Sequence, residues 1–426
     1  MLTIYTENIT SRIVYTLSII FDDRQIKWQV TDDFKMFQEA PSPKFAYAKQ
    51  TKQEICIPPS VVLFETGIKQ YAIQKTNWKQ EEILSFDAIP DVLASVFYVI
   101  SLYDDYLQVE KDKHGRNIGE KSILYQFGWL DKLQVERWSE ALIDFIEEEN
   151  KCSLNRKKIP FQCVPTFDID NTYAYRLKGR FRLILSVFKD VFNGDKRRIK
   201  ERSEVLNNKI QDPYDTFDKI ISIAQENEST KIFWLLGDYG KYDKNISHTC
   251  KEQKYLIQKM SSYALVGLHP SYRSNKKVEQ LKVEKERLEN ILKKKVLHTR
   301  QHYLKVQLPD TFRVLEKEGF TDDYSLGYAD VVGFRAGIAR SFLWFDIEND
   351  KMSNLRLHPI TYMDGTLNEY MKLSIDEALD VVEKLKNEVA EYGGKFISLW
   401  HNETIGDYQN WKGWSKVLEK SIKCND

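Results

Sequence analysis

The sequence predicts an α/β fold, an irregular or incomplete (β/α) barrel in residues 159–426 that follows a smaller α+β accessory domain in residues 1–158. From Pro160 onward, short apolar runs alternate with amphipathic helical stretches, as in a mostly parallel sheet that closes, or nearly closes, into a barrel. Before that point, β-like and helical segments mix without such alternation. The chain of 426 residues is also too long for one ordinary core. These observations favour two domains.

The elements expected in the first domain are a β-like run at Ser60–Phe64 and helical stretches at Asp91–Leu107 and Val135–Glu149. In the last stretch, apolar residues recur at helical spacing. The segment Lys111–Asn117 reads KDKHGRN and is a charged turn. We interpret His114 within it as a loop residue or a small interface contact, because nothing in this region has catalytic spacing.

The second domain contains five expected strands, which are Phe161–Phe167, Lys231–Leu236, Tyr263–Leu268, Arg300–Val306 and Lys395–Trp400. Amphipathic helices are expected at Lys276–Lys295 and Ser374–Tyr392. The second of these helices begins with Ser374 and Glu377, spaced as a capping box, and ends at a pair of glycines. The basic run Lys196–Arg202 is interpreted as a solvated helix face in an insertion between the first two strands.

Composition excludes several function classes. The 63 basic and 63 acidic residues cancel, so no global field steers the chain toward nucleic acid or anionic lipid. No apolar run approaches the roughly 20 residues that span a bilayer, and the N-terminus does not resemble a signal peptide. The five cysteines show no CxxC pairing, which argues against a disulfide framework and a thiolate zinc site. We therefore expect a cytoplasmic protein in which any metal is held by carboxylates and imidazoles.

The stretch PTFDID at Pro165–Asp170 is the most informative in the chain. Asp168 and Asp170 are two residues apart at the end of an apolar run, so in a strand both side chains point to the same side. Two such acids can serve as a proton acceptor and a metal ligand. A strand end followed by an Asx turn would leave the same pattern.

The other expected strands also end in residues capable of chemistry, which are Asp238, His269, Arg300, His302, Tyr303 and His401. In α/β barrels the active site is built at the carboxyl ends of the strands. Strands commonly lead into polar loops, so a single residue of this kind means little. The joint pattern means more, because three of only seven histidines fall at these positions.

Several motifs keep the order found in a known family. TFDID at 166–170, GLHPSY at 267–272, RQHYL at 300–304 and LWHN at 399–402 resemble the motifs of NodB-type polysaccharide deacetylases, carbohydrate esterase family four. The phrases GFRAG at 333–337 and HPITYMDGTL at 358–367 look like a divergent branch of that superfamily, often found in bacterial surface-polysaccharide gene sets. That branch carries an N-terminal α/β region with a phrase similar to FYVISLYDDYL at 97–107. The resemblance implies a deacetylase-like barrel.

Roles follow from this resemblance, position by position. Asp168 matches the family's catalytic base, and Asp170 and His269 match metal ligands. Arg300 corresponds to the arginine that orients the base. Tyr303 falls where a backbone N–H helps bind the oxyanion.

Two further positions complete the implied machinery. Asp323 answers to the acidic residue of the fourth motif, and His401 to the general-acid histidine of the last. The implied activity is metal-assisted removal of an acetyl group from an N-acetylated sugar of a polysaccharide or its precursor. The implied cofactor is a divalent metal such as zinc, and the implied partner is a carbohydrate.

One departure concerns the metal. The family places a second histidine four residues after the first, but here that position is Arg273, which cannot bind a metal. Ser274, His302, His248 or a water could complete the site. His302 could equally be a substrate contact or a packed histidine, and Asp238 is a further candidate for metal or substrate.

The Arg273 departure keeps two rival functions open. One is a catalytically degenerate carbohydrate-binding or scaffold protein, and the other is a hydrolase of a small non-sugar amide. Among weaker signals, Asp364 looks like a turn acid that could reach the sugar if its loop folds over the barrel mouth. Trp411 and Trp414 could stack on a sugar ring or cover the barrel's end.

Overall fold

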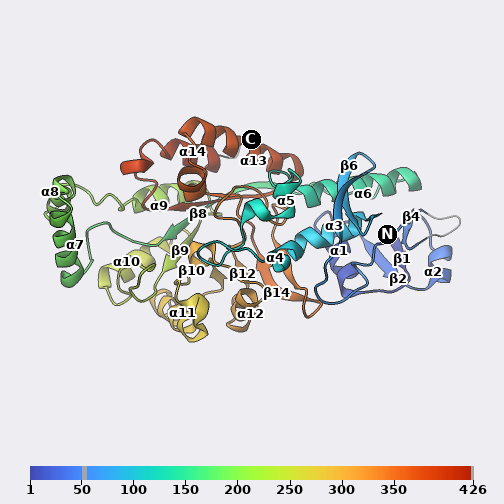
Figure 1. Ribbon diagram of the computed structural model, residues 1–426, viewed down its shortest axis with the longest axis horizontal. Coiled ribbons are helices and arrows are strands. Elements are labelled where there is room, and N and C mark those ends of the chain that lie inside the picture. The colour runs from blue at the N-terminus through green and yellow to red at the C-terminus, as the bar shows by residue number, and fades with distance from the viewer. Residues whose placement is uncertain (50–54, 424–426) are drawn as a thin grey trace.

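The structure is a computed structural model that describes residues 1–49 and 55–423. Cys424, one of the five cysteines, lies outside the described residues. The molecule is elongated, with the N-terminal strands at one end and a protruding helical hairpin at the other (Figure 1). A large sheet lies between these two ends.

The N-terminal part contains two small sheets. A parallel sheet has the order β2-β1-β3-β4, and an antiparallel one has the order β5-β6-β7. The strands are β1 (Leu2–Thr6), β2 (Trp28–Thr31), β3 (Lys44–Tyr47), β4 (Cys56–Ile57), β5 (Ile73–Trp78), β6 (Glu81–Phe86) and β7 (Ile89–Pro90). The helices are α1 (Ser11–Phe21), α2 (Phe34–Glu39), α3 (Val92–Ile100), α4 (Tyr103–Leu107), α5 (Ile123–Gln126) and α6 (Gln134–Asn150), and the 3₁₀ turn η1 is Gly119–Lys121.

Two expectations for this part are wrong in detail. The run Ser60–Phe64 forms a turn rather than a strand, because it follows two prolines and Ser60 donates its N–H and hydroxyl to Asp91 instead of to a ladder. The stretch predicted as one helix from Asp91 is two helices, separated at Leu102, whose φ of 60° is not helical. Helix α6 forms where helical spacing indicated it.

The second part is built on nine strands in the order β13-β14-β12-β11-β10-β9-β8-β16-β15. The strands are β8 (Phe161–Ile169), β9 (Lys231–Leu235), β10 (Leu265–His269), β11 (His298–Thr299), β12 (Asp322–Asp323), β13 (Phe342–Asp346), β14 (Lys351–Leu357), β15 (Tyr362–Met363) and β16 (Gly394–His401). Every pairing is parallel except that of β13 with β14. The predicted α/β class with a mostly parallel sheet is therefore confirmed. Residues 358–361 alone connect β14 to β15, which lie toward opposite ends of this order.

Helices flank the sheet on two sides, with α13 and α14 on one and α11 and α12 on the other (Figure 1). The helices are α7 (Arg180–Phe192), α8 (Lys196–Leu206), α9 (Phe217–Glu226), α10 (Lys251–Met260), α11 (Val278–Leu292), α12 (Asp310–Lys317), α13 (Ile375–Tyr392) and α14 (Ser415–Ile422). The short helical turns are η2 (Ser274–Lys276), η3 (His302–Leu304), η4 (Thr366–Tyr370) and η5 (Gln409–Trp411). Helix α13 has the predicted capping box, and the basic run begins α8 within the protruding hairpin between β8 and β9. None of the helices in the described ranges is both long and apolar enough to cross a membrane.

The predicted strand Arg300–Val306 is wrong. The ladder at this place is only β11, and the chain then turns into η3, where Tyr303 has a φ of 63°. Arg300 leaves the ladder because its buried guanidinium is held by the Tyr324 carbonyl and by Asp168. Strand β8, which pairs with β9 and β16, runs two residues further than predicted, so Asp168 lies within the ladder.

Buried ion pairs join the N-terminal part to the large sheet region. Arg335 binds Asp105 at 3.0 Å, and Arg340 binds Glu136 at 2.8 Å. The apolar core is likewise one cluster with residues from both parts. This packing places the charged turn at 111–117 against the loops that follow β10 and β11, so N-terminal residues can reach the carboxyl ends of the strands.

Candidate metal centre and active site

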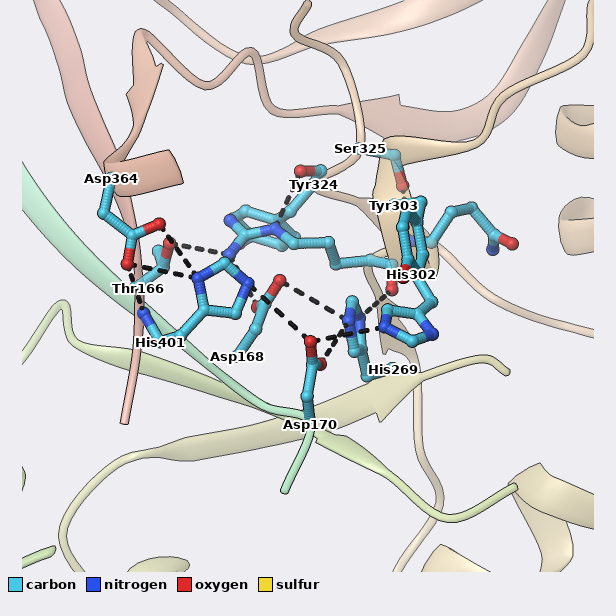
Figure 2. A network of polar contacts seen from close by, with 12 residues as sticks. Thr166, Asp168, Asp170, His269, His302, Tyr303, Tyr324, Ser325, Asp364 and His401 are labelled. Carbon is cyan, nitrogen blue, oxygen red and sulfur yellow. Dashed lines mark hydrogen bonds and ion pairs between the residues drawn. The ribbon is translucent and has the colours of Figure 1, made fainter. Parts of the chain in front are cut away.

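A cavity of about 400 Å³ opens at the carboxyl ends of β8, β10 and β16. We call it the central cavity. Its polar wall contains Arg116, Asp168, Asp170, His269, His302, Asp364, Glu369, His401, Glu403 and Thr404. Its aromatic wall contains Tyr214, Tyr303, Tyr370, Tyr408 and Trp411. Figure 2 shows the central carboxylates and imidazoles pointing toward one another. The distant strand-end residues therefore converge in space.

Asp170, His269 and His302 form a compact cluster at the floor of this cavity. One ligand atom from each residue lies within 4.8 Å of the others. Asp170 follows the last residue of β8, and His269 is the last residue of β10. His302 begins the η3 turn, whose left-handed residue Tyr303 directs the chain back toward the cavity. The three side chains thus come from three separate chain segments.

The hydrogen bonds of the two histidines indicate that this cluster fits a cation. The Nδ1 of His269 lies 2.6 Å from the Arg300 carbonyl, which can only accept, so Nδ1 carries a proton and Nε2 is the ring nitrogen that faces Asp170. Nε2 and Asp170 Oδ1 are 3.1 Å apart, yet neither buried atom has a hydrogen-bond partner among the described residues. With Nε2 unprotonated, both atoms are acceptors and repel each other, so this pair needs a positive charge, from a bound cation or from a proton on Nε2.

His302 is oriented in the same way. Its Nδ1 lies 3.0 Å from the buried Asp243, and its Nε2 lies 3.2 Å from Asp170 Oδ2. A carboxylate or carbonyl behind each imidazole is the usual support of a metal-binding histidine. The structure therefore brings His302, rather than the exposed Arg273, next to Asp170 and His269 as the third member of this cluster. Sequence reasoning did not identify Asp243, because it lies in a loop with no recognisable motif.

Asp168 lies beside this cluster and is paired with Arg300. Its Oδ1 accepts a hydrogen bond of 3.0 Å from Arg300 Nη1, and its Oδ2 is 3.6 Å from His269 Nε2. The guanidinium also donates to the Thr166 hydroxyl, and its ring neighbour Phe233 lies 4.5 Å away. Both members of the pair are almost fully buried. Arg300 therefore fixes the direction of the carboxylate and leaves Oδ2 facing the metal-type cluster.

His401, the last residue of β16, lines the cavity next to the two acids of β8 and is held by Asp364. The imidazole Nδ1 is 2.9 Å from Asp364 Oδ1, and the His401 N–H donates to Oδ2 at 2.9 Å. His401 pairs with Asp168 in the β16–β8 ladder, and its Nε2 is 3.9 Å from Asp170 Oδ2. Asp364 is fully buried, so its loop does fold over the site, where it contacts the histidine. Its position in the motif MDGT indicated a turn acid but not this partner.

Buried charges shift several pKa values here. Burial opposes ionisation of Asp170, but His302 and His269 lower the pKa of Asp170 well below its usual range. Burial opposes the charge on His401, but Asp364 and Asp170 raise the pKa of His401 well above its usual range. Burial, together with the charge of Asp170, raises the pKa of Glu403 to about 7. The site thus combines a stable carboxylate with an imidazolium.

The N-terminal part contributes to the wall of the cavity. Arg116 donates to the Tyr303 carbonyl at 2.7 Å and to the Tyr370 hydroxyl at 3.1 Å. His114 packs on Tyr303, with ring centroids 4.8 Å apart. Of the two roles expected for it, a loop residue or a small interface contact, it therefore has the second. Arg116 was missed by sequence reasoning, because only the tertiary packing brings it to η3.

Three residues predicted as candidates for metal or substrate contact lie outside the central cavity. The Ser274 hydroxyl donates to the Ser271 carbonyl at 2.7 Å, and the half-exposed Asp238 pairs with Arg287 at 2.8 Å. Asp323 is fully buried and accepts from the N–H and hydroxyl of Ser325. None of the three is among the residues that line the central cavity. Each is satisfied by a neighbour, which is why it does not turn toward the cluster.

The two tryptophans of the C-terminal loop have different surroundings. Trp411 lines the central cavity. Trp414 is buried in the core and packs against Trp411, with ring centroids 5.6 Å apart. Only Trp411 is therefore placed to meet a ligand, while Trp414 supports it.

The chain was compared with protein families, curated sequences and solved structures. Residues 2–151 match the model of a family of unknown function, DUF7033. No curated protein sequence matches the chain. A solved structure described as a polysaccharide deacetylase from Mycobacterium smegmatis is similar at 13% identity and a TM-score of 0.39, over 62% of this chain and 87% of that one.

Two further solved structures are similar at the same level. Puue allantoinase has 13% identity and a TM-score of 0.35, over 61% of this chain and 83% of that one. A protein described as a polysaccharide deacetylase from Pseudomonas aeruginosa PAO1 has 10% identity and a TM-score of 0.33, over 62% of this chain and 83% of that one. Because similarity at this level is weak, the chemistry of the site has to be argued from its own residues.

Proposed function

We propose that the protein is a metal-assisted amide hydrolase that removes the acetyl group from an N-acetylated sugar of a polysaccharide or its precursor, and that its sheet forms an irregular deacetylase-like barrel. The main observation in support of the metal assignment is that Asp170 Oδ1 and His269 Nε2, both buried and 3.1 Å apart, have no hydrogen-bond partner among the described residues. The motif resemblance supplies the substrate class. The aromatic wall of the central cavity is suited to sugar rings.

Asp170, His269 and His302 would hold a divalent cation such as zinc, which when bound polarises an acyl carbonyl and makes a water more acidic. The chain's own residues would then handle the protons. Asp168 keeps one oxygen on Arg300 and has the other free to accept a proton from a water near His269. Arg300 restricts the carboxylate to this direction.

His401 would act as the general acid. Its Nδ1 is held by Asp364, so its Nε2–H faces the cavity, where it can donate a proton to the departing amine. Asp168 and His401 are neighbours on adjacent strands, and this register places base and acid on the same side of the cavity. The Tyr303 backbone N–H, on the rim of the cavity, is the proposed donor to the oxyanion.

The test is release of acetate from N-acetylated oligosaccharides by protein loaded with zinc, cobalt or nickel. Asp168→Asn and His401→Ala should each lower kcat by about 10² or more, because each removes a proton-transfer group. Asp238→Asn, which changes a half-exposed acid outside the cavity, is the matched control and should keep full activity. Equal residual activity in all three variants would overturn the assignment.

A scaffold protein without activity is less well supported by the geometry. That hypothesis arose because Arg273 stands where the family has a second metal-binding histidine. His302, from another segment, offers a ligand atom in its place. Metal analysis of protein purified without chelators distinguishes the two functions. Stoichiometric zinc supports the hydrolase, and its loss in the His302→Ala variant identifies the ligand.

A further inference from the structure

A second cavity, of about 530 Å³, lies between the α7–α8 hairpin and the body of the protein. We call it the hairpin cavity. It shares three lining residues with the central cavity, which are Tyr214, Tyr408 and Gln409. The two cavities therefore meet at a common wall. A ligand longer than one sugar that occupies the central cavity can extend across this wall into the hairpin cavity.

The lining of the hairpin cavity is strongly basic. Six cations line it, which are Lys178, Arg182, Lys189, Arg198, Arg202 and Lys244. The only acid among its lining residues is Asp190. This composition contrasts with the whole chain, in which 63 acidic residues balance 63 basic ones. Positive charge is thus locally in excess in this cavity, and a cleft lined by charges of one sign attracts ligands of the opposite sign.

The innermost cations have few anionic partners. Arg202 is 3% exposed; its Nη2 contacts Asp190 and the Ser186 hydroxyl, but its Nη1 has no hydrogen-bond partner among the described residues. Arg182 donates to two neutral backbone carbonyls, at 2.8 and 2.9 Å, and lies over the ring of Tyr239. A buried guanidinium with a free N–H is costly unless an acceptor from outside completes it.

Lys178 lies between this cavity and the metal-type cluster. Its ammonium contacts the amide oxygen of Asn171, the residue that follows Asp170. Burial, with the nearby Arg182, lowers the pKa of Lys178 to about 7. The ammonium is in contact with a neutral amide, and the more distant carboxylates of Glu403 and Asp212 only partly offset the effect of burial, so Lys178 can still donate to an anion in the hairpin cavity.

Tyrosine rings pack against two of these cations. Arg182 lies 4.1 Å from the ring centroid of Tyr239, and Arg202 lies 5.4 Å from that of Tyr175. Rings held next to guanidinium groups provide a flat surface for a sugar and donors for its charged substituent. The cavity therefore has the chemistry to recognise a charged sugar rather than a bare ion.

We propose that the hairpin cavity is a subsite for an anionic group, a phosphate or a carboxylate, carried by the glycan whose acylated sugar occupies the central cavity. The part of this statement that concerns the acylated sugar rests on the proposed function, whereas anion binding does not. Arg202 Nη1, Lys178 and Arg182 are the donors that meet the anion. The substrate class thereby narrows to anionic glycans.

Calorimetric titration tests this subsite with three probes. Hyaluronan tetrasaccharide carries carboxylates, UDP-N-acetylglucosamine carries phosphates, and N-acetylchitotetraose is neutral. Lys178→Met and Arg182→Gln should weaken binding of the anionic probe by about tenfold or more, because each removes a charge-assisted hydrogen bond. Both should leave N-acetylchitotetraose unaffected. Arg197→Gln, an exposed cation of the same hairpin that does not line the cavity, is the matched control.

Salt provides an independent readout. Binding of the anionic probe should weaken between about 0.05 and 0.5 M NaCl, since added ions screen the cations. Whichever of the two charged probes responds to the variants identifies phosphate or carboxylate as the ligand. If neither charged probe binds more tightly than the neutral one, or if Lys178→Met, Arg182→Gln and Arg197→Gln are indistinguishable, the subsite assignment is wrong.

The titration separates this inference from the proposed function, because it requires no turnover. Charge-dependent binding without acetate release from any probe would retain the anion subsite and reject the deacetylase. Acetate release from the neutral tetrasaccharide, with no response to Lys178 or Arg182, would retain the enzyme and reject the subsite.

Discussion

Removal of the buried cation Arg300 should strongly destabilise the fold. Arg300 is 0% exposed and Asp168 is 2% exposed, and their charged atoms are 3.0 Å apart. At an effective dielectric constant of about 20, two unit charges at this distance attract by about 5 kcal/mol. Arg300→Met keeps an apolar chain of similar shape but leaves Asp168 buried without its partner. We expect a loss of about 3–5 kcal/mol in the free energy of unfolding, measured by urea denaturation at pH 7.

A second Arg–Asp pair of the chain, which is partly exposed, serves as a control for the effect of burial on the Arg300–Asp168 pair. Arg287 and Asp238 form the same type of pair at 2.8 Å, but their side chains are 16% and 46% exposed. Water screens this pair, so Arg287→Met should cost only about 0–1 kcal/mol. Because the two distances are nearly equal, a large difference between the variants measures the effect of burial.

A double variant isolates the uncompensated charge. Arg300→Met with Asp168→Asn removes both charges, and it should recover at least half of the stability lost in Arg300→Met alone. If Arg300→Met costs no more than Arg287→Met, or if the double variant is less stable than Arg300→Met alone, the electrostatic reasoning is refuted. Loss of the donors to Thr166 and Tyr324 would then account for the effect.

Three other predictions concern the ligand set, the general acid and a buried acid. His302→Ala should weaken zinc affinity by at least about 10²-fold in competition titrations with a chromophoric chelator, since even outer-shell substitutions cost about 10- to 100-fold, whereas Arg273→Ala should have no effect. Asp364→Asn should lower kcat for acetate release by about 10² or more with little change in KM, because the imidazolium loses its negative partner. Asp323→Asn should match the wild type in stability near or below pH 4 and exceed it by at most about 4 kcal/mol near pH 9 in thermal or urea unfolding.

Burial of Asp323 explains why the Asp323→Asn variant should become more stable than the wild type as the pH rises. Burial raises the pKa of Asp323 to about 7, above its value of about 3.9 in the unfolded chain. The neutral carboxyl is thus favoured in the folded state, so its contribution is fully present below about pH 4 and is lost as the pH rises through 7. Asparagine stays neutral at every pH. An unchanged stability difference between pH 4 and pH 9 would contradict this.

Other outcomes would contradict the predictions for zinc binding and for the general acid. Zinc affinity that falls in Arg273→Ala and persists in His302→Ala would restore the family's usual ligand spacing. A rise in KM with kcat unchanged in Asp364→Asn would mean that Asp364 shapes the pocket and does not orient the acid.

Much of the fold was predictable from local patterns. The apolar runs that became β8, β9, β10 and β16 are buried strands, and their ends were placed within about two residues, because burial on a parallel sheet requires a continuous apolar sequence. The capping box of α13 was equally predictable, since it depends on residues only three positions apart. The strand after Arg300 was not, because that residue's conformation depends on Asp168 and Tyr324, distant in the chain.

The sequence by itself determined which chemistry is present: two acids on one side of a strand end, and histidines where neighbouring strands end. Only the tertiary structure decided how they are completed, with His302 as the third member of the cluster, Asp364 behind His401 and Arg116 on the cavity wall. The physical reason is the distance along the chain over which each feature is determined. Strand periodicity is a local property, whereas His302 lies on a turn with left-handed residues, and its partners lie 59 and 132 positions away. No spacing rule along the chain encodes such contacts, because packing of the whole sheet creates them.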